Sequence, residues 1–139
     1  MKNPINRYPE VFAEGKCARD PFSADWFHED ARGGRAVERQ RSRAQQACSG
    51  CPLRQQCLAM ALEFESDDGH SWGIWGGVSA RDRRDVLQAL AASGIPRAAV
   101  DFDRLAESVV EASEAGQAQV TPLPRTKQQE PLQLVRRTA

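Results

Sequence analysis

Aromatic residues make up only 6% of this 139-residue sequence, whereas charged residues make up 27%. A chain of this length has room for one domain with a modest core, so the burial of apolar side chains alone leaves it marginally stable. We therefore expect a further stabilising element, such as disulfides, a bound metal or a partner. The four cysteines are the residues that could supply the first two.

Long hydrophobic runs are also absent. The segment MKNPINRYPEVFAEG has no apolar core of signal-peptide length, and no later run is long enough to span a bilayer. We therefore expect a cytoplasmic protein that makes no membrane contact. Thiols stay reduced in the cytosol, where clustered cysteines more often bind metal or do redox chemistry than form disulfides. A disulfide framework is the less favoured alternative.

The sequence carries no net charge, because 19 Lys and Arg balance 19 Asp and Glu. This balance argues against a protein that holds nucleic acid by simple electrostatic attraction. The charges are unevenly placed, however: residues 32–56 hold six arginines and one acid, and residues 57–77 hold four acids and no Lys or Arg. An arginine run on a helix is most often a solvated face.

The four cysteines follow the pattern Cys17-x30-Cys48-x2-Cys51-x5-Cys57. Two cysteines separated by two residues can bind one centre, and the third can turn back to it from the next helix. Cys17 must then be brought in by tertiary folding. Four thiolates suit either a [4Fe–4S] cluster or a tetrahedral zinc ion, and the spacing alone does not choose between them. A redox dithiol at Cys48 and Cys51 is another alternative, although no βαβ pattern surrounds it.

Helix-forming residues and apolar periodicity predict helices over 35–48, from Pro52 to about 66, over 80–92 and roughly over 97–115. The stripe of Leu53, Met60 and Phe64 predicts core packing, and Ser79 is the expected N-cap of the third helix.

The glycines of residues 72–77 (WGIWGG) predict a tight turn that presents Trp75 to solvent. From Gly116 onward, Gln, Pro and Thr dominate and predict a disordered tail. We accordingly divide the chain into an irregular segment (1–16), a cysteine-bearing domain (17–92), a helical extension (93–115) and the tail (116–139).

Taken together, the cysteine spacing and the Gly-Ile-Trp-Gly-Gly turn at 73–77 resemble the WhiB-like (Wbl) family of actinobacteria and their phages. The likeness covers about residues 17–90. It implies an all-α fold wrapped around one [4Fe–4S] cluster per chain, sensitive to oxygen and nitric oxide. The cluster ligands implied by the resemblance are Cys17, Cys48, Cys51 and Cys57.

The resemblance further implies a transcription regulator, not an enzyme, that docks on the C-terminal domain of the principal sigma factor of RNA polymerase. Trp75 matches the turn tryptophan of that contact, and Trp26 and Phe27 resemble the aromatic pair that follows the first cysteine. Promoter DNA is a second candidate partner. However, residues 78–139 hold nine basic and eight acidic residues where the family commonly has a strongly basic stretch. The alternative function is a thiol–disulfide oxidoreductase that uses Cys48 and Cys51 in the cluster-free form.

Overall fold

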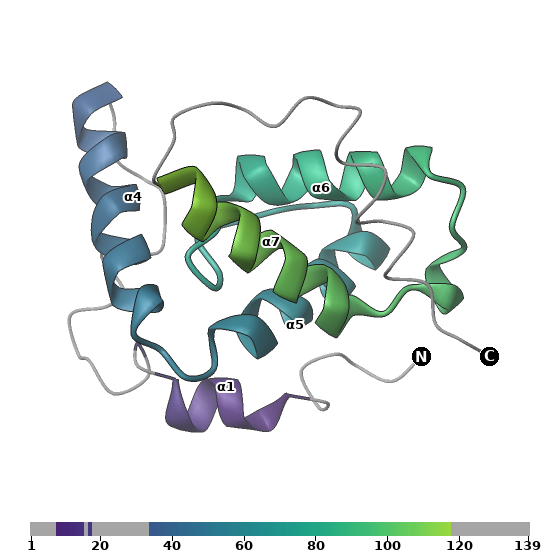
Figure 1. Cartoon of the computed structure of the whole chain (residues 1–139), viewed down its shortest axis with the longest axis horizontal. Helices are drawn as coiled ribbons and strands as arrows, with labels where there is room; N and C mark the ends of the chain where they lie inside the picture. Colours follow the sequence, from purple (N-terminus) through teal and green to yellow (C-terminus); the bar gives the residue numbers. More distant parts are fainter. Residues whose placement is uncertain (1–7, 16, 18–33, 118–139) are drawn as a thin grey trace.

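The computed structural model describes residues 8–15, 17 and 34–117, and it is built from helices (Figure 1). They are α1 (Pro9–Glu14), α4 (Gly34–Ser49), α5 (Arg54–Asp68), α6 (Ala80–Ala92), the 3-10 helix η2 (Arg97–Ala99) and α7 (Phe102–Gln117). Within these ranges the β pairing outside helices is an isolated bridge between Trp75 and Val78. The all-α prediction is confirmed in this part of the chain.

The ends of the helices follow from local chemistry. At the start of α6, the Ser79 hydroxyl accepts a hydrogen bond from the Asp82 N–H at 3.2 Å, as its predicted N-cap role requires. α5 ends at Gly69, whose N–H donates to the carbonyl of Glu65 at 2.9 Å. The prediction placed the start of this helix at Pro52, but α5 begins at Arg54 because the chain first turns after Cys51.

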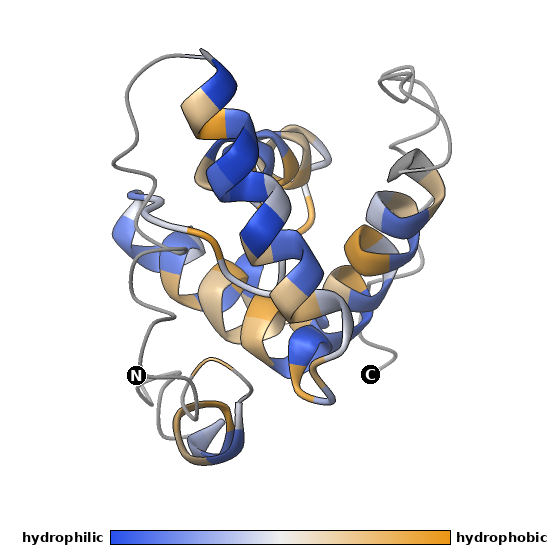
Figure 2. Cartoon of the chain, turned by 90° about the vertical axis from the view of Figure 1, so that its left-hand side faces the viewer, coloured by the Kyte–Doolittle hydropathy of each residue, from blue (hydrophilic) through white to orange (hydrophobic). Residues whose placement is uncertain are grey.

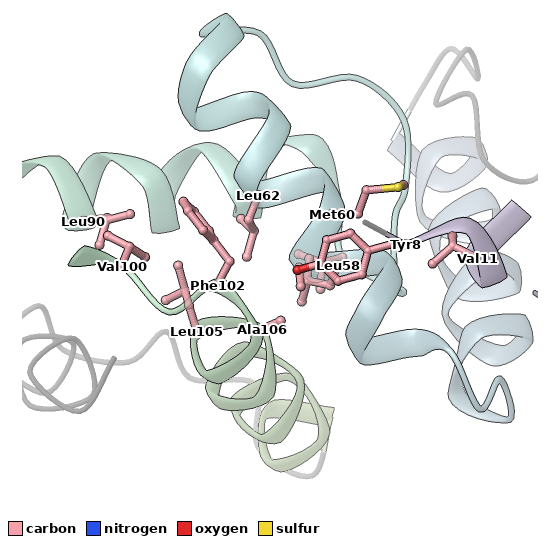
Figure 3. Packing of buried hydrophobic residues seen from close by; sticks show 12 residues of the cluster. Tyr8, Val11, Leu58, Met60, Leu62, Leu90, Val100, Phe102, Leu105 and Ala106 are labelled. Atoms are coloured by element: carbon pink, nitrogen blue, oxygen red, sulfur yellow. The ribbon is translucent and has the colours of Figure 1, made fainter. Parts of the chain in front are cut away.

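α5 lies at the centre of the molecule and packs chiefly against α7, with α6 as a lesser neighbour (Figure 1). Figure 3 shows the core between them, with Val11 of α1 and the preceding Tyr8 at one end. The core side chains include Leu58, Met60 and Leu62 of α5, Leu90 of α6, Val100, and Phe102, Leu105 and Ala106 of α7. The segment predicted as a helical extension therefore contributes directly to the same core as the cysteine-bearing helices.

α4 has a different character, since Ala44 is its one buried residue. Most of its residues are hydrophilic, as the colours of the ribbon show (Figure 2). None of the helices in the described ranges has the length and apolar character needed to cross a bilayer.

Two predictions of side-chain exposure are wrong. Phe64 was expected in the core but is 45% exposed, because α7 covers the face of α5 that carries Leu58 and Leu62, and Phe64 lies on another face. Trp75 was expected to be exposed to solvent, but it is half-buried and packs against the edge of the core. Trp72, three residues earlier in the same loop, is 75% exposed.

A fully buried ion pair joins α5 to α6. The guanidinium of Arg83 donates from Nε to both oxygens of Glu65, at 3.0 and 2.9 Å, and from Nη2 to Oε1 at 2.7 Å. Arg83 has no solvent exposure and Glu65 has 6%. The same guanidinium donates to the backbone carbonyls of Trp72, Gly73 and Val78 at 2.6–2.9 Å. One side chain therefore holds α5, α6 and both ends of the loop between them.

We expect Arg83→Ala to lower the free energy of unfolding by about 3–5 kcal/mol, because the change leaves the Glu65 carboxylate and three carbonyls buried without their donor. Urea denaturation followed by circular dichroism measures this loss. The matched control is Arg84→Ala, at an exposed position on the same helix, which should change the stability by no more than about 0.5 kcal/mol. Equal losses in the two variants would contradict the structural role of Arg83.

Candidate metal centre

All four cysteines line one cavity of about 490 Å³, which we call the cysteine cavity. Cys17 reaches it just after α1, Cys48 from the C-terminal end of α4, and Cys57 from the beginning of α5. In Figure 1 these three elements meet at the lower left of the molecule. The other lining residues are Val11, Gly15, Ala47, Leu53, Arg54, Trp72, Gly73, Ile74, Trp75 and Gly76. Four residues that are distant in sequence are therefore brought to one place by the fold.

The short spacing between Cys48 and Cys51 closes a turn. The Cys51 N–H donates to the carbonyl of Cys48 at 3.0 Å, and the Arg54 N–H donates to the carbonyl of Cys51 at 3.2 Å. The chain thus passes from α4 into α5 through two consecutive turns, and both cysteines line the cavity. No group of three His, Cys, Asp or Glu side chains in the described ranges is close enough to hold a single metal ion.

The Gly76–Gly77 turn lies beside Cys48 and the first turn of α5, and Gly76 lines the cavity as well. Trp75 and Val78 exchange backbone hydrogen bonds of 3.2 and 3.1 Å across the glycine turn, and the two glycines have φ values of +59° and +76°. A Cβ on Gly76 would stand 2.7 Å from the carbonyl oxygen of Arg54 and 2.8 Å from Cβ of Leu58. Glycine is therefore required at position 76 for two reasons, the positive φ angle and the close approach of the backbone to α5.

Burial governs the acidity of the thiols. It raises the pKa of Cys57 from 9.0 to about 12 and that of Cys48 from 9.0 to about 11, and the neighbouring cysteines add to both shifts. Backbone N–H groups of the turn oppose the rise, Gly76 for the pKa of Cys57 and Gly77 for that of Cys48. Without a cation in the cavity both thiols are thus neutral near pH 7, and a bound metal centre must displace their protons.

A positive charge stands at the cavity wall. Arg54 is 6% exposed, and its Nε donates to the carbonyl of Gly76 at 2.9 Å. Its Nη1 forms an ion pair with Glu114 of α7 at 3.2 Å. Its Nη2 is buried and makes no hydrogen bond within the described residues. Arg54 is not among the site residues predicted from the sequence, although its place between Cys51 and Cys57 in the first turn of the helix was an available signal.

Trp75 connects the cysteine cavity to a second, apolar hollow of about 190 Å³, since it lines both. Its Nε1 donates to the carbonyl of Trp72 at 3.0 Å, and its ring meets Phe12 edge to face with centroids 6.4 Å apart. The other predicted partner-binding residues, Trp26 and Phe27, lie outside the described residues.

Comparison with known proteins shows which family has this arrangement of cysteines and glycines in its sequence. The profile of the family described as "Transcription factor WhiB" matches residues 12–86, a span that contains all four cysteines, Arg54 and the Gly76–Gly77 turn. This chain belongs to the WhiB family. The resemblance noted in the sequence is therefore confirmed.

Three curated relatives of this WhiB-family protein are named as transcriptional regulators, in line with the expected regulator, not an enzyme. WhiB3 of Mycobacterium tuberculosis, named as redox- and pH-responsive, is 36% identical over 75 residues, which are 54% of this chain and 69% of the relative. WhiB7 of Mycolicibacterium smegmatis is 42% identical over 55 residues, 40% of this chain and 48% of the relative. WhiD of Streptomyces coelicolor is 29% identical over 71 residues, 51% of this chain and 60% of the relative.

The raised thiol pKa values give a direct test of the metal-free protein. Only the thiolate reacts with iodoacetamide, and a pKa raised from 9.0 to about 12 lowers the thiolate fraction of Cys57 near neutral pH. We expect Cys57 to be alkylated about a thousandfold more slowly in native buffer than in urea, because each pKa unit changes that fraction about tenfold. The rate in native buffer should continue to rise above pH 9.0.

Mass spectrometry of peptides after timed labelling measures each cysteine separately. Alkylation in urea of the same sample is the control, since unfolding removes the burial that raises the pKa. Equal rates for Cys57 in native buffer and in urea would contradict the raised pKa of this partly buried thiol.

Proposed function

We propose that this WhiB-family protein is a redox-responsive regulator of transcription that binds one [4Fe–4S] cluster on Cys17, Cys48, Cys51 and Cys57. The observation that carries the proposal is the cysteine cavity itself, in which four thiols and the buried cation of Arg54 surround one space. A [4Fe–4S] cluster held by four thiolates is anionic, so both the donor set and the charge of the wall fit it.

The size of the cavity favours a cluster over a zinc ion. A zinc ion bound by four thiolates lies about 2.3 Å from each sulfur, at a single point. The cysteine cavity, at about 490 Å³, is many times larger than the volume of about 30 Å³ that one water molecule takes up in the liquid. A group of several metal and sulfide atoms uses such a space, whereas one ion does not.

When bound, the cluster supplies a centre that can take up or lose an electron and that oxygen and nitric oxide attack. The cysteines of this chain would couple its presence to the arrangement of the helices. Cys17 follows α1, Cys48 lies in the last turn of α4, and Cys51 and Cys57 flank the start of α5, so four bonds to one cluster would tie three helices together. Loss of those bonds would remove the link from α1 and α4 to the wall that also carries Trp75.

The proposed partner is the C-terminal domain of the principal sigma factor of RNA polymerase, as the resemblance to the WhiB-like family implies. Support comes from the apolar surface next to the cysteine cavity, where Phe12, Phe64 and Trp72 are exposed by 48%, 45% and 75%. Aromatic side chains of this kind are enriched at the centres of protein interfaces. Trp75 borders both this surface and the cavity, so cluster loss would alter the interface as well.

The oxidoreductase alternative is less well supported. A dithiol exchange needs an attacking thiolate, and the pKa of Cys48 is raised to about 11 by burial, which leaves little thiolate near pH 7. Cytoplasmic location and contact with promoter DNA remain proposals that follow from the regulatory role.

We expect anaerobically purified protein to contain iron and acid-labile sulfide in equal amounts and to absorb broadly in the visible range. Cys17→Ala should lose the iron, the sulfide and the colour, because three thiolates leave one iron of the cluster without a protein ligand. Metal and sulfide analysis decides the outcome. A stoichiometric zinc content in the colourless wild-type protein would overturn the cluster, and a full cluster in Cys17→Ala would remove Cys17 from the ligand set.

We expect Trp75→Ala to weaken binding to the sigma-factor domain by about thirtyfold, since truncating a central aromatic contact typically costs about 2 kcal/mol. Calorimetry under anaerobic conditions measures the affinity. The visible absorption of the variant is the control, because Trp75 also lines the cysteine cavity. Weakened binding with the absorption intact supports the interface, whereas bleaching of the variant would make Trp75 a structural residue.

A further inference from the structure

Arg54 is a buried cation whose hydrogen bonds are incomplete. It is the first residue of α5 and is 6% exposed, and the structure assigns partners to two of its three nitrogens. The third, Nη2, is buried and makes no hydrogen bond to any described residue. A buried guanidinium without full pairing is costly, by several kcal/mol or more in a dry site, unless an anion lies nearby.

Glu114 does not neutralise this charge completely. Its side chain is 59% exposed, so water screens the attraction between its carboxylate and Nη1 of Arg54. The Nε–H is used by the uncharged carbonyl of Gly76. The positive charge of the guanidinium is therefore least compensated at the buried Nη2.

Nη2 lies at the wall of the cysteine cavity. A Cβ built on Gly77 would lie 3.2 Å from Nη2 of Arg54 and also 3.2 Å from Cβ of Cys48, so the nitrogen and the cysteine flank the same glycine. Arg54 itself lines the cavity beside all four cysteines. Any substituent at position 77 would come between the charge and the cysteine wall.

We propose that the guanidinium of Arg54 holds a fixed positive charge at the wall of the cysteine cavity and would raise the reduction potential of a cluster bound there. This inference rests on the proposed cluster and deepens it. Reduction adds one electron to the cluster, and a nearby cation stabilises the more negative product more than the oxidised form. Because Nε of Arg54 also holds the carbonyl of Gly76, the same side chain links the charge of the cavity to the turn that carries Trp75.

The test uses full-length protein purified anaerobically with its cluster, reduced stepwise by dithionite in the presence of redox mediators and followed by electron paramagnetic resonance. We expect Arg54→Gln, which removes the charge, to shift the potential to a more negative value than that of the wild type. Arg54→Lys, which keeps the charge, should lie between the two. The control is Arg81→Gln, which removes a positive charge from an exposed position on α6 and should leave the potential unchanged.

An unchanged potential in Arg54→Gln with a complete cluster would overturn the inference and leave the cluster itself untouched. If Arg54→Gln does not fold, Arg54→Lys decides, because lysine keeps the charge but lacks the planar fork that places Nη2 of Arg54 at the cavity wall. Its potential should be more negative than that of the wild type, and an equal or less negative potential overturns the inference. Failure of the proposed function is distinguishable, since the wild-type protein would then contain no cluster to titrate.

Discussion

The buried pair between Arg83 and Glu65 is the interaction on which the rest of the structure depends. All three nitrogens of the Arg83 guanidinium donate hydrogen bonds. Nε and Nη2 donate to the carboxylate of Glu65, and Nη1 and Nη2 donate to carbonyls of the loop from Trp72 to Val78. Breaking a pair of this kind leaves an uncompensated charge in the interior, so neither partner can be removed alone without a large loss of stability. The loop has its place because α5 and α6 share one guanidinium.

The second arginine completes the support of the same loop from the other side. Arg54 holds the carbonyl of Gly76, and Gly76 in turn packs against the first turn of α5 too closely for any side chain. The two cations thus fix the loop at separate points, Arg83 at its ends and Arg54 at its tip. The cysteine cavity, which has this tip as one wall, inherits its shape from both.

Local patterns predicted much of this, because helix formation depends on neighbouring residues. The helix at 80–92 and its Ser79 cap agree with the structure, and α4 differs from its predicted range by one residue at each end. The convergence of the cysteines was expected from their spacing and the family resemblance. Tertiary packing decided the rest: the exposure of Phe64 depends on where α7 lies. The burial of Arg54 and Arg83 depends on partners 18 to 60 residues away in sequence, which no local pattern contains.

Trp72 combines an immobile backbone with an exposed side chain. Its carbonyl accepts hydrogen bonds from Nη2 of Arg83 at 2.7 Å and from Nε1 of Trp75 at 3.0 Å, whereas 75% of the residue faces solvent. An apolar ring on a mobile loop loses conformational entropy when a partner covers it, and this loss subtracts from the binding free energy. At Trp72 the backbone part of that loss has already occurred during folding. The ring is therefore preorganised, and a protein that covers it keeps more of the free energy of its hydrophobic contact.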